Sequence, residues 1–595
     1  MKFFSHSSLL LLASMYPIKY IFFLLRGWIA SVLLTVLFPI SQVHAQVPQW
    51  QMVVASDESI GSGNDYSSVT GTAVDANGNL LLTGYFTGSV NFGGLTMTSA
   101  GGSDAFVAKW NSTTNSFAWV QQAGGVGNDQ ATSIAITAAG IYVAGYFGGA
   151  NAVFGSITLT NGARFASSDS FVAKLTDAGT SGGFIWAQRV GGTGNEYISA
   201  IAANGTSIYA VGNFDGTTAT FGAANLTNAG AVSSADAFVT KLIDAGNSSS
   251  FTWAQRAGGT GNEYAITAAV IGANLYVAGS FASPAVNFGN TTLTNASNAA
   301  VPLADGFITR LTDLGTSSSY AWAQQVGGPN LDYVTGLAVS GNNVFMCGAF
   351  CSSTVAFGNS TLTNAATNGT RDAFIAKLTD VGAGPAFVWA QRAGGTDNDF
   401  ANALAVDGTN VYLTGAFAGA AGFGVMGLTA VGSYDVFIAK VVDFGSTSLL
   451  EWAQHAGGAD DDRASTVTEI GGKVYVGGSV VAPAYFGVQT VTGRGDIVAF
   501  LASLTDPTLT ATTALRSENI GLFPNPAHGR VSVQVPALNG LATLTVLDAL
   551  GRAVRTQAAP ANARTVLDLG GLAPGLYAVR AEAGGTATTQ RLVVE

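Results

Sequence analysis

Apolar and polar residues alternate along short segments through most of the chain, which is the pattern of half-buried β-strands. Residues 411–417 (VYLTGAF) and 435–441 (DVFIAKV) are two such segments. Between residues 401 and 458, no apolar residues recur at the three-to-four spacing of an amphipathic helix. The pattern therefore predicts four main strands and an added hairpin, GFGVMGLTA (422–430), in one antiparallel sheet.

The same pattern returns with a period that tryptophan marks. WAQRVGGTGNEYI (186–198) and WAQRAGGTGNEYA (253–265) are nearly identical phrases. The tryptophans at the corresponding position follow one another after 63 to 69 residues: Trp50, Trp119, Trp186, Trp253, Trp322, Trp389 and Trp452. Such a period predicts one supersecondary unit that is repeated and packs against its neighbours.

The composition of the strands predicts how the repeated sheets are arranged. One strand of each unit is rich in small residues, for example SAIAAN (199–204), which fits the crowded inner edge of a propeller blade. We expect the innermost strands near residues 69–75, 131–137, 198–204, 265–271, 334–340, 401–407 and 464–470. The tryptophan strand is then outermost. These features predict an all-β, seven-bladed β-propeller of four-stranded blades over residues 46–506.

The two ends of the repeat region predict how the ring closes. The last unit has a third strand, DIVAFLASL (496–504), but no tryptophan strand follows it. A tryptophan strand, VPQWQMVVAS (47–56), instead precedes the first unit. We expect this N-terminal strand to complete the last blade, because that pairing removes a free sheet edge.

The units resemble the SBBP family of bacterial β-propeller repeats. DANGNLLLTGYF (75–86) and DAFVAKW (104–110) match its typical phrases, and the resemblance covers the region 46–506. It implies a propeller fold and a location at the cell surface, and it implies no particular activity.

Composition and charge narrow the possible partners. Of the 595 residues only 10% are charged, and the net charge is −11. An acidic, lysine-poor surface argues against nucleic acid as a partner. The two cysteines, Cys347 and Cys351, exclude a disulfide framework, and on one strand they would be too far apart to form a bond. We expect a monomer that packing alone stabilises.

Two sets of acids recur once in each unit. The first follows the Gly-rich turn after the tryptophan strand: Asp65, Asp129, Glu196, Glu263, Asp332, Asp399 and Asp462. The second precedes the third strand: Asp104, Asp169, Asp236, Asp305, Asp372, Asp435 and Asp496. A ring of carboxylates could bind calcium, but recurrence in every unit favours turn chemistry, because backbone requirements recur and special sites break symmetry. We therefore expect no cofactor, and GGADDDR (457–463) is the one segment that could hold a cation.

The propeller topology predicts which face could bind a ligand. The acidic turns and the FG hairpins should lie on the same face, around the central opening. We expect the hairpin phenylalanines to be anchors that pack inward: Phe92, Phe154, Phe221, Phe288, Phe357, Phe423 and Phe486. Beyond residue 45 the chain has two histidines, His455 and His528, and no catalytic triad or zinc motif can be assembled around them.

The first 45 residues are typical of a secretory signal. Two apolar runs, 8–15 and 27–38, surround Lys19 and Arg26, and VHA precedes Gln46. We expect cleavage after Ala45, and Met15 is a possible true start. The alternative, a membrane anchor, needs a longer unbroken apolar run.

The last residues follow a different pattern. After a Thr-rich linker at 507–518, alternating strands with Pro and Gly turns predict a small β-sandwich at 519–595. FPNPA (523–527), LDALGR (547–552) and LAPGLYAVR (572–580) closely resemble the type A C-terminal sorting domain of the type IX secretion system. The resemblance implies export across an outer membrane by that machinery, removal of the domain, and attachment of the rest to the surface. The matching motif residues are Pro524, Asn525, Pro526, Gly551, Gly575 and Tyr577.

Two functions are consistent with the sequence. The first is a secreted or surface-attached, non-enzymatic scaffold for binding or adhesion, with a glycan or a protein as the ligand. The second is an extracellular polysaccharide hydrolase or lyase with a site at the central opening. The near-identical units favour the first function, because an enzyme should distinguish one or two units.

Overall fold

The computed structural model describes residues 47–58, 65–162, 167–230, 234–297, 299, 302–366, 369–382, 384–492, 497–506, 521–534, 541–548, 552–560, 563–583 and 586–594. All regular elements in these residues are β-strands. Among the same residues, no helix is long and apolar enough to cross a membrane. The predicted signal (1–45), the predicted linker (507–518) and Gly551 lie outside the described residues.

A four-stranded antiparallel sheet is the repeated element. In the second unit, β9 (Asp129–Thr137), β10 (Gly140–Phe147), β13 (Asp169–Asp177) and β14 (Gly182–Gly192) pair in this order. The middle strands β10 and β13 are buried on both faces, because neighbouring sheets cover each side. This explains why their sequences are almost continuously apolar.

The same four strands occur along the whole repeat region. The first strands are β3 (Ser67–Val74), β9, β15 (Glu196–Asn204), β21 (Glu263–Ile271), β27 (Asp332–Ser340), β33 (Asp399–Asp407) and β39 (Arg463–Ile470). The second strands are β4 (Leu80–Phe86), β10, β16 (Ser207–Phe214), β22 (Asn274–Phe281), β28 (Asn343–Phe350), β34 (Asn410–Phe417) and β40 (Lys473–Val481). The third strands are β7 (Asp104–Asn111), β13, β19 (Asp236–Asp244), β25 (Asp305–Asp313), β31 (Asp372–Asp380), β37 (Asp435–Asp443) and β43 (Ile497–Thr505). The fourth strands are β8 (Ser116–Gly124), β14, β20 (Ser249–Ala257), β26 (Ser318–Val326), β32 (Pro385–Gly395), β38 (Ser448–Gly458) and β1 (Trp50–Ala55).

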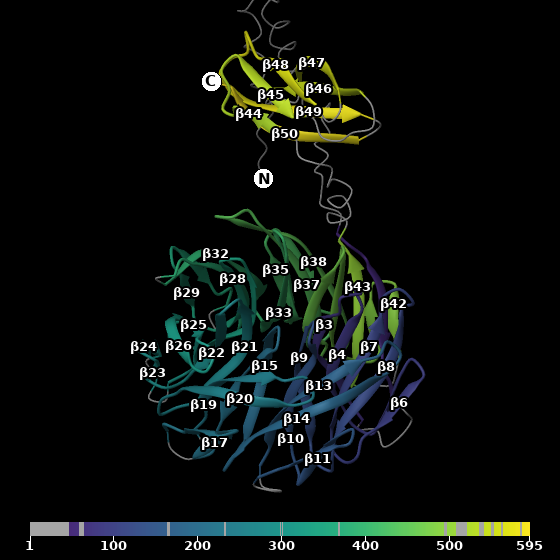
Figure 1. Cartoon of the computed structure of the whole chain (residues 1–595), viewed down its shortest axis with the longest axis vertical. Helices are drawn as coiled ribbons and strands as arrows, with labels where there is room; N and C mark the ends of the chain where they lie inside the picture. Colours follow the sequence, from purple (N-terminus) through teal and green to yellow (C-terminus); the bar gives the residue numbers. More distant parts are fainter. Residues whose placement is uncertain are drawn as a thin grey trace, which may run out of the picture. The chain divides into compact units, whose positions relative to one another are not determined.

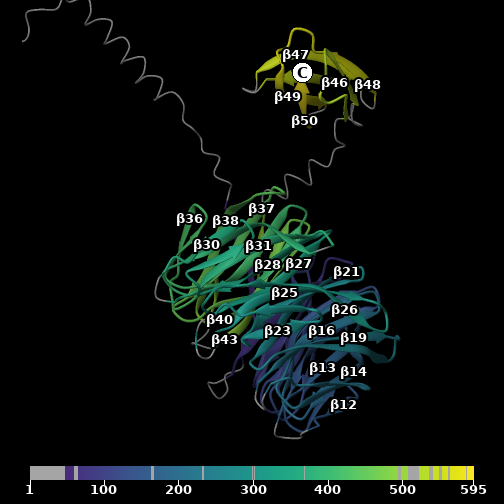
Figure 2. The ribbon, with the colours of Figure 1, turned by 90° about the vertical axis from the view of Figure 1, so that its left-hand side faces the viewer.

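The first strands contact one another in a closed circuit. Each packs beside the first strand of the next unit, and β39 packs beside β3. We call this arrangement the sheet ring. Figures 1 and 2 show its sheets side by side, with β3, β9, β15, β21 and β33 around the middle of Figure 1. The small-residue strand is therefore innermost, as predicted, and the tryptophan strand is the outermost of the four main strands.

The N-terminal strand closes the last sheet, as expected. β1 pairs with β43 in the sheet β1-β43-β40-β39, and Val53 lies opposite Ala502. Thr72 of β3 and Thr466 of β39 share a hydrogen bond (Oγ1 to Oγ1, 2.7 Å) between the first and last units. Residues more than 400 positions apart are thus direct neighbours in one sheet.

The hairpins correct one prediction. They are β5 (Ser89–Phe92) with β6 (Leu95–Thr98), β11 (Asn151–Phe154) with β12 (Ile157–Thr160), β17 (Thr218–Phe221) with β18 (Ala224–Thr227), β23 (Ala285–Phe288) with β24 (Thr291–Thr294), β29 (Thr354–Phe357) with β30 (Ser360–Thr363), β35 (Ala420–Phe423) with β36 (Met426–Thr429), and β41 (Ala484–Phe486) with β42 (Gln489–Val491). We expected each hairpin to extend its own sheet. Instead β11 pairs with β8, β17 with β14, β35 with β32 and β41 with β38, in each case the fourth strand of the preceding unit.

The pairing of hairpins with the preceding unit has a physical reason. The hairpin leaves from the end of the second strand, in the middle of its own sheet, where both edges are already paired. The fourth strand of the preceding unit offers a free edge next to it, and pairing there removes that edge. The seven hairpin phenylalanines are at most 2% exposed, so their predicted inward packing is confirmed.

A cluster of charge and aromatic groups joins neighbouring units at the far end of the third strands. Lys174 Nζ of β13 lies 2.7 Å from Asp244 Oδ2 at the end of β19 in the next unit. Trp186 Nε1 donates to Asp244 Oδ1 (3.0 Å), and Tyr142 Oη donates to Oδ2 (2.8 Å). We call this four-residue arrangement the latch. In four units the indole N–H donates to the corresponding aspartate of the following unit, which gives a reason for tryptophan at this position: Trp119, Trp186, Trp253 and Trp389.

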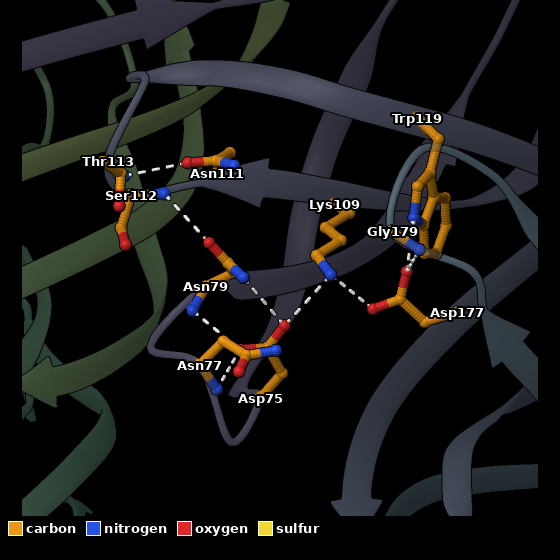
Figure 3. Close-up of polar contacts among 10 residues, drawn as sticks. All are labelled: Asp75, Asn77, Asn79, Lys109, Asn111, Ser112, Thr113, Trp119, Asp177 and Gly179. Carbon is orange, nitrogen blue, oxygen red and sulfur yellow. Dashed lines mark hydrogen bonds and ion pairs between the residues drawn. The ribbon is translucent and has the colours of Figure 1, made fainter.

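The latch recurs with variations. Figure 3 shows it between the first two units, where Lys109 lies between Asp75 and Asp177, and Trp119 donates to Asp177. Lys241, Arg310, Lys377 and Lys440 make the corresponding ion pairs with Asp313, Asp380, Asp443 and Asp506. Where the last unit meets the first, Ser503 occupies the lysine position and Ser112 the aspartate position, so this junction has no ion pair of the latch type. Trp50, in the last sheet, instead donates to the carbonyl of His455 in the sixth unit (3.0 Å).

Both cysteines are free thiols. Cys347 is fully buried in the core between the fifth and sixth units, and burial raises the pKa of its thiol to about 12. Cys351 is half-buried in the turn after β28. Cys347 therefore acts as a small core residue, as expected.

The C-terminal residues form two further antiparallel sheets. One contains β44 (Gly521–Phe523), β45 (Arg530–Gln534) and β48 (Arg564–Asp568). The other contains β47 (Ala553–Pro560), β46 (Leu541–Leu547), β49 (Gly575–Ala583) and β50 (Thr586–Val594). Val531, Leu544, Val579 and Leu592, from both sheets, belong to one buried core.

Candidate functional site

The seven acids of the predicted ring lie at or just before the starts of the first strands. Because these strands form the inner circuit of the sheet ring, the acids surround one end of its centre. Asp65 is half-buried, and the other six are at most 1% exposed. They therefore do not form an open ring of carboxylates on the surface.

Turn chemistry holds most of these acids in place. Asp399 Oδ2 accepts a hydrogen bond from the N–H of Gly395 (2.7 Å), and Oδ1 accepts from Ala418 (3.3 Å). The equivalent bonds connect Gly125 and Gly148 to Asp129, and Gly458 and Val481 to Asp462. Each acid thus ties the Gly-rich turn to the start of the following hairpin, which is the scaffold role that recurrence favoured.

The two sets of acids meet in pairs across the boundary between units. A methyl group added to Gly394 would lie 2.5 Å from Asp372 Oδ1 and 2.7 Å from Asp399 Oδ2. The same two contacts occur over Gly124 with Asp104 and Asp129. The first glycine of the repeated GG is therefore required because two carboxyl groups close over its backbone.

Burial and this pairing change the protonation of the acids. Burial and the nearby Asp372 raise the pKa of Asp399 to about 7. Burial, with Asp169 beside it, raises the pKa of Glu196 to about 9. Burial also raises the pKa of Asp104 to about 6. Two carboxyl groups in one buried place cannot both ionise readily, so these pairs retain protons near neutral pH.

Arginine or histidine accompanies the second acid in several units. Arg189 Nη1 lies 2.7 Å from Asp169, Arg256 lies 2.7 Å from Asp236, and Arg392 lies 2.8 Å from Asp372. His455 takes the same place beside Asp435 (3.1 Å). In three of these units a guanidinium group therefore lies beside the second acid.

The last unit departs from the second acid set. Asp496 lies outside the described residues. The strand register places Val498 opposite Val480, as Asp236 lies opposite Phe214 in the third unit. The structural equivalent of the second acid is therefore Val498, and the sequence prediction for Asp496 is corrected. Counting along the sequence failed here because β43, the third strand of the last unit, is shifted by two residues relative to the third strands of the other units.

The GGADDDR segment does not gather its three carboxylates. Asp462 is buried against Gly458, whereas Asp460 and Asp461 are exposed. Arg463 Nη2 lies 3.3 Å from Asp461. Among the residues that the structure describes, no group of three or more His, Cys, Asp or Glu side chains could hold a metal ion.

Aromatic residues lie at the same end of the first strands as these acids. The residue directly after each acid of the first set alternates to the other face of the strand and is half-buried or exposed. These residues are Tyr66, Gln130, Tyr197, Tyr264, Tyr333, Phe400 and Arg463. We call this set, with the rings packed against it, the aromatic mouth.

Further rings complete the aromatic mouth. Tyr146 packs against Tyr197 at a centroid distance of 4.9 Å, and Tyr85 packs against Tyr66 at 5.9 Å. On another side, Tyr434 packs against Phe400 at 5.7 Å. Burial raises the pKa of Tyr146 and of Tyr333 to about 12, so their hydroxyl groups stay protonated and can donate hydrogen bonds. Sequence reasoning missed this surface, although the recurring phrases GNDY, GNEY and DNDF carry its signal.

The motif residues of the C-terminal region have structural contacts. The side-chain amide of Asn525 binds the backbone of β50 at two places. Its Nδ2 donates to the carbonyl of Arg591 (2.7 Å), and its Oδ1 accepts from the N–H of Val593 (2.8 Å). Pro524 and Pro526 flank it in the turn after β44. Gly575 begins β49, and Tyr577 Oη donates to the carbonyl of Ala573 (2.9 Å).

The C-terminal region matches a known family. Residues 521–595 match the secretion system C-terminal sorting domain. The protein is therefore exported by the type IX secretion system, whose machinery handles this domain, and it is secreted or attached to the cell surface. No curated protein sequence matches the chain.

One solved structure is similar to a large part of the chain. It is a Trypanosoma rangeli sialidase in complex with 2,3-difluorosialic acid as a covalent intermediate. The identity is 9%, the similar region covers 77% of this chain and 83% of the sialidase, and the TM-score is 0.29.

Proposed function

We propose that the protein is a secreted or surface-attached seven-bladed β-propeller, followed by a small C-terminal β-sandwich, that binds a glycan at the aromatic mouth without cleaving it. The closed circuit of first strands and the pairing of β1 with β43 support the propeller. SBBP-like repeats are consistent with this architecture.

One observation carries the binding function. Aromatic rings from several units stay partly exposed together at the start of the first strands, at one end of the sheet ring. Exposed rings on a rigid scaffold offer flat apolar surfaces against which the C–H faces of sugars can pack, and tyrosine hydroxyls add hydrogen bonds. The partly exposed Tyr197 and Tyr333 are the central residues of this proposal.

The state of the acids favours binding over hydrolysis. A glycosidase needs two carboxyl groups that reach the substrate from opposite sides of the bond. The paired acids described above are buried and hydrogen-bonded to backbone N–H groups or to arginine. They support the turns that carry the aromatic mouth.

A glycan array with the full chain, expressed without residues 1–45, tests the proposal. We expect binding to at least one polysaccharide, and we expect Tyr197→Ala with Tyr333→Ala to weaken it at least tenfold. Tyr485→Ala is the matched control, because Tyr485 is 53% exposed on a hairpin away from the first strands, and it should bind as the parent does.

Two outcomes would contradict the proposal. Binding that does not change in the double variant would place the site elsewhere. Release of new reducing ends or of unsaturated products from the bound polysaccharide would support the hydrolase or lyase instead.

A further inference from the structure

The aromatic mouth has two chemically different sides. On one side, Tyr66 packs against Tyr85 and Tyr146 packs against Tyr197, and no cation of the described residues lies over these rings. On the other side, two arginines from different units converge on one ring. The guanidinium carbon of Arg371 lies 5.3 Å from the centroid of Phe400, and that of Arg463 lies 5.9 Å from the same centroid.

Three consecutive units build the cationic side. Arg371 directly precedes β31, Phe400 and Tyr434 belong to the next unit, and Arg463 begins β39 in the unit after that. Arg463 also lies 4.6 Å from the centroid of Tyr434. The rings hold the guanidinium groups by cation–π contacts, so two positive charges face the mouth at fixed positions.

Neither arginine is neutralised by a buried partner. Arg371 forms no ion pair with a residue that the structure describes. Arg463 pairs only with Asp461, at 3.3 Å, and both side chains are about half exposed (44% and 51%). Such a surface pair is weak and exchanges easily with another anion. Elsewhere in the sheet ring the cations of the latch lie against buried carboxylates. Arg371 and Arg463 therefore differ from the other cations of the repeat.

We infer that the cationic side of the aromatic mouth binds the carboxylate groups of an acidic polysaccharide, such as a polyuronate. Each guanidinium presents a planar fork of N–H donors that matches a carboxylate, and an aromatic ring beside it supports the sugar that carries the carboxylate. The hydroxyl of Tyr333 stays protonated, because burial raises its pKa to about 12, and it can donate to an anionic oxygen held by Arg371 and Arg463. This inference deepens the proposed function and rests on it.

A second charged group offers a sharper test. Asp461 competes with a ligand for Arg463. Removing its carboxylate frees the guanidinium and also removes a repulsive charge from the mouth. Asp461→Ala should therefore strengthen the binding of an acidic polysaccharide, whereas Arg463→Met should weaken it.

The experiment measures the affinity of the full chain for oligogalacturonate by titration calorimetry. Dextran sulfate and neutral dextran serve as the sulfated and uncharged probes. We expect Arg371→Met with Arg463→Met to bind oligogalacturonate at least tenfold more weakly. Methionine keeps an apolar stem over the rings, and an unchanged unfolding temperature shows that the variant is folded. Arg371→Lys should give an intermediate loss, and Asp461→Ala a gain of about two- to fivefold.

The outcomes separate this inference from the proposed function. Glycan binding that the tyrosine variants weaken but the arginine variants do not would overturn the cationic site and keep the aromatic one. Preference for dextran sulfate over oligogalacturonate would assign sulfate rather than carboxylate and overturn the polyuronate. Binding to none of the three probes would overturn the inference, and absence of binding across the glycan array would also overturn the proposed function.

Discussion

Aspartates at the two ends of the third strands have pKa values that are shifted in opposite directions. At the start of β31, Asp372 shares a buried place with Asp399, and burial raises the pKa of both. At the end of β19, burial also opposes ionisation of Asp244, but hydrogen bonds from Lys174, Tyr142 and Trp186 outweigh it and hold its pKa below the usual range. Both ends join neighbouring units. One end does so with a pair of acids that retains a proton, and the other with a charged aspartate.

This difference shows that the surroundings of a residue, not its type, decide its charge. An aspartate that contacts a lysine ammonium group and an indole N–H stays ionised although it is buried, whereas two carboxyl groups packed over a glycine retain a proton. The two ends should therefore respond in opposite directions to pH, and each can be broken separately by a single substitution.

We expect the largest effect at the latch. Asp244→Ala leaves the buried ammonium of Lys174 without its carboxylate, and such a loss costs about 3–5 kcal/mol of unfolding free energy. Guanidinium unfolding followed by tryptophan fluorescence measures it. Asp407→Ala, at an exposed turn, is the control and should stay within about 0.5 kcal/mol of the parent. A loss below about 1 kcal/mol for Asp244→Ala would refute the latch as a main contact between units.

A smaller loss is expected from Gly394→Ala at the other end. The new methyl group would lie 2.5 Å from Asp372 Oδ1 and 2.7 Å from Asp399 Oδ2, and the φ of +151° adds strain. Together these should cost about 2–4 kcal/mol. Gly408→Ala separates the two causes, because Gly408 has a φ of +59° and open space around it, so backbone strain of about 1 kcal/mol should remain alone. Equal losses in the two variants would contradict crowding by the acid pair.

The smallest effect is a change in pH dependence. The unfolded chain loses the proton of an aspartate near pH 4, whereas folded Asp399 keeps it until about pH 7. Its contribution to stability is therefore full below pH 4 and falls as the pH rises to 7. Asp399→Asn should lose less stability than the parent between pH 5 and 8, by about 1–3 kcal/mol.

Asp244→Asn gives the opposite comparison. The pKa of Asp244 is lowered in the folded state, so its contribution is present above pH 4 and falls as the pH decreases below that value. The stability deficit of this variant should narrow towards acid pH. Parallel pH profiles for the two asparagine variants would refute the difference between the ends.

Much of the architecture could be predicted from local pattern. Alternating strands, the tryptophan period and the small residues of 199–204 predicted four-stranded antiparallel sheets with the correct inner and outer strands. The orphan strand at 47–56 predicted the pairing of β1 with β43. These features depend on the two-residue period of strands and on strands that would otherwise lack a partner, and both can be recognised in the sequence.

Contacts between units could not be predicted in the same way. Lys174 and Asp244 are 70 residues apart, and a period tells how often a unit recurs but not which neighbour a side chain reaches. The hairpins were assigned to the wrong sheet for this reason. The aromatic mouth was not predicted, because its residues stand one position after the acids and on the opposite face of the strand.

The position of β43 has a mechanical consequence. This strand lies between β40 and β1, and Asp506 directly after it accepts hydrogen bonds from Tyr412 (2.9 Å) and Lys440 (2.8 Å). A pull on the chain from residue 507 onward reaches Asp506 first and then runs along β43. It must shear two rows of backbone hydrogen bonds at once rather than open them one by one. Tension from a C-terminal attachment would therefore meet the sheet ring where two strands share the load.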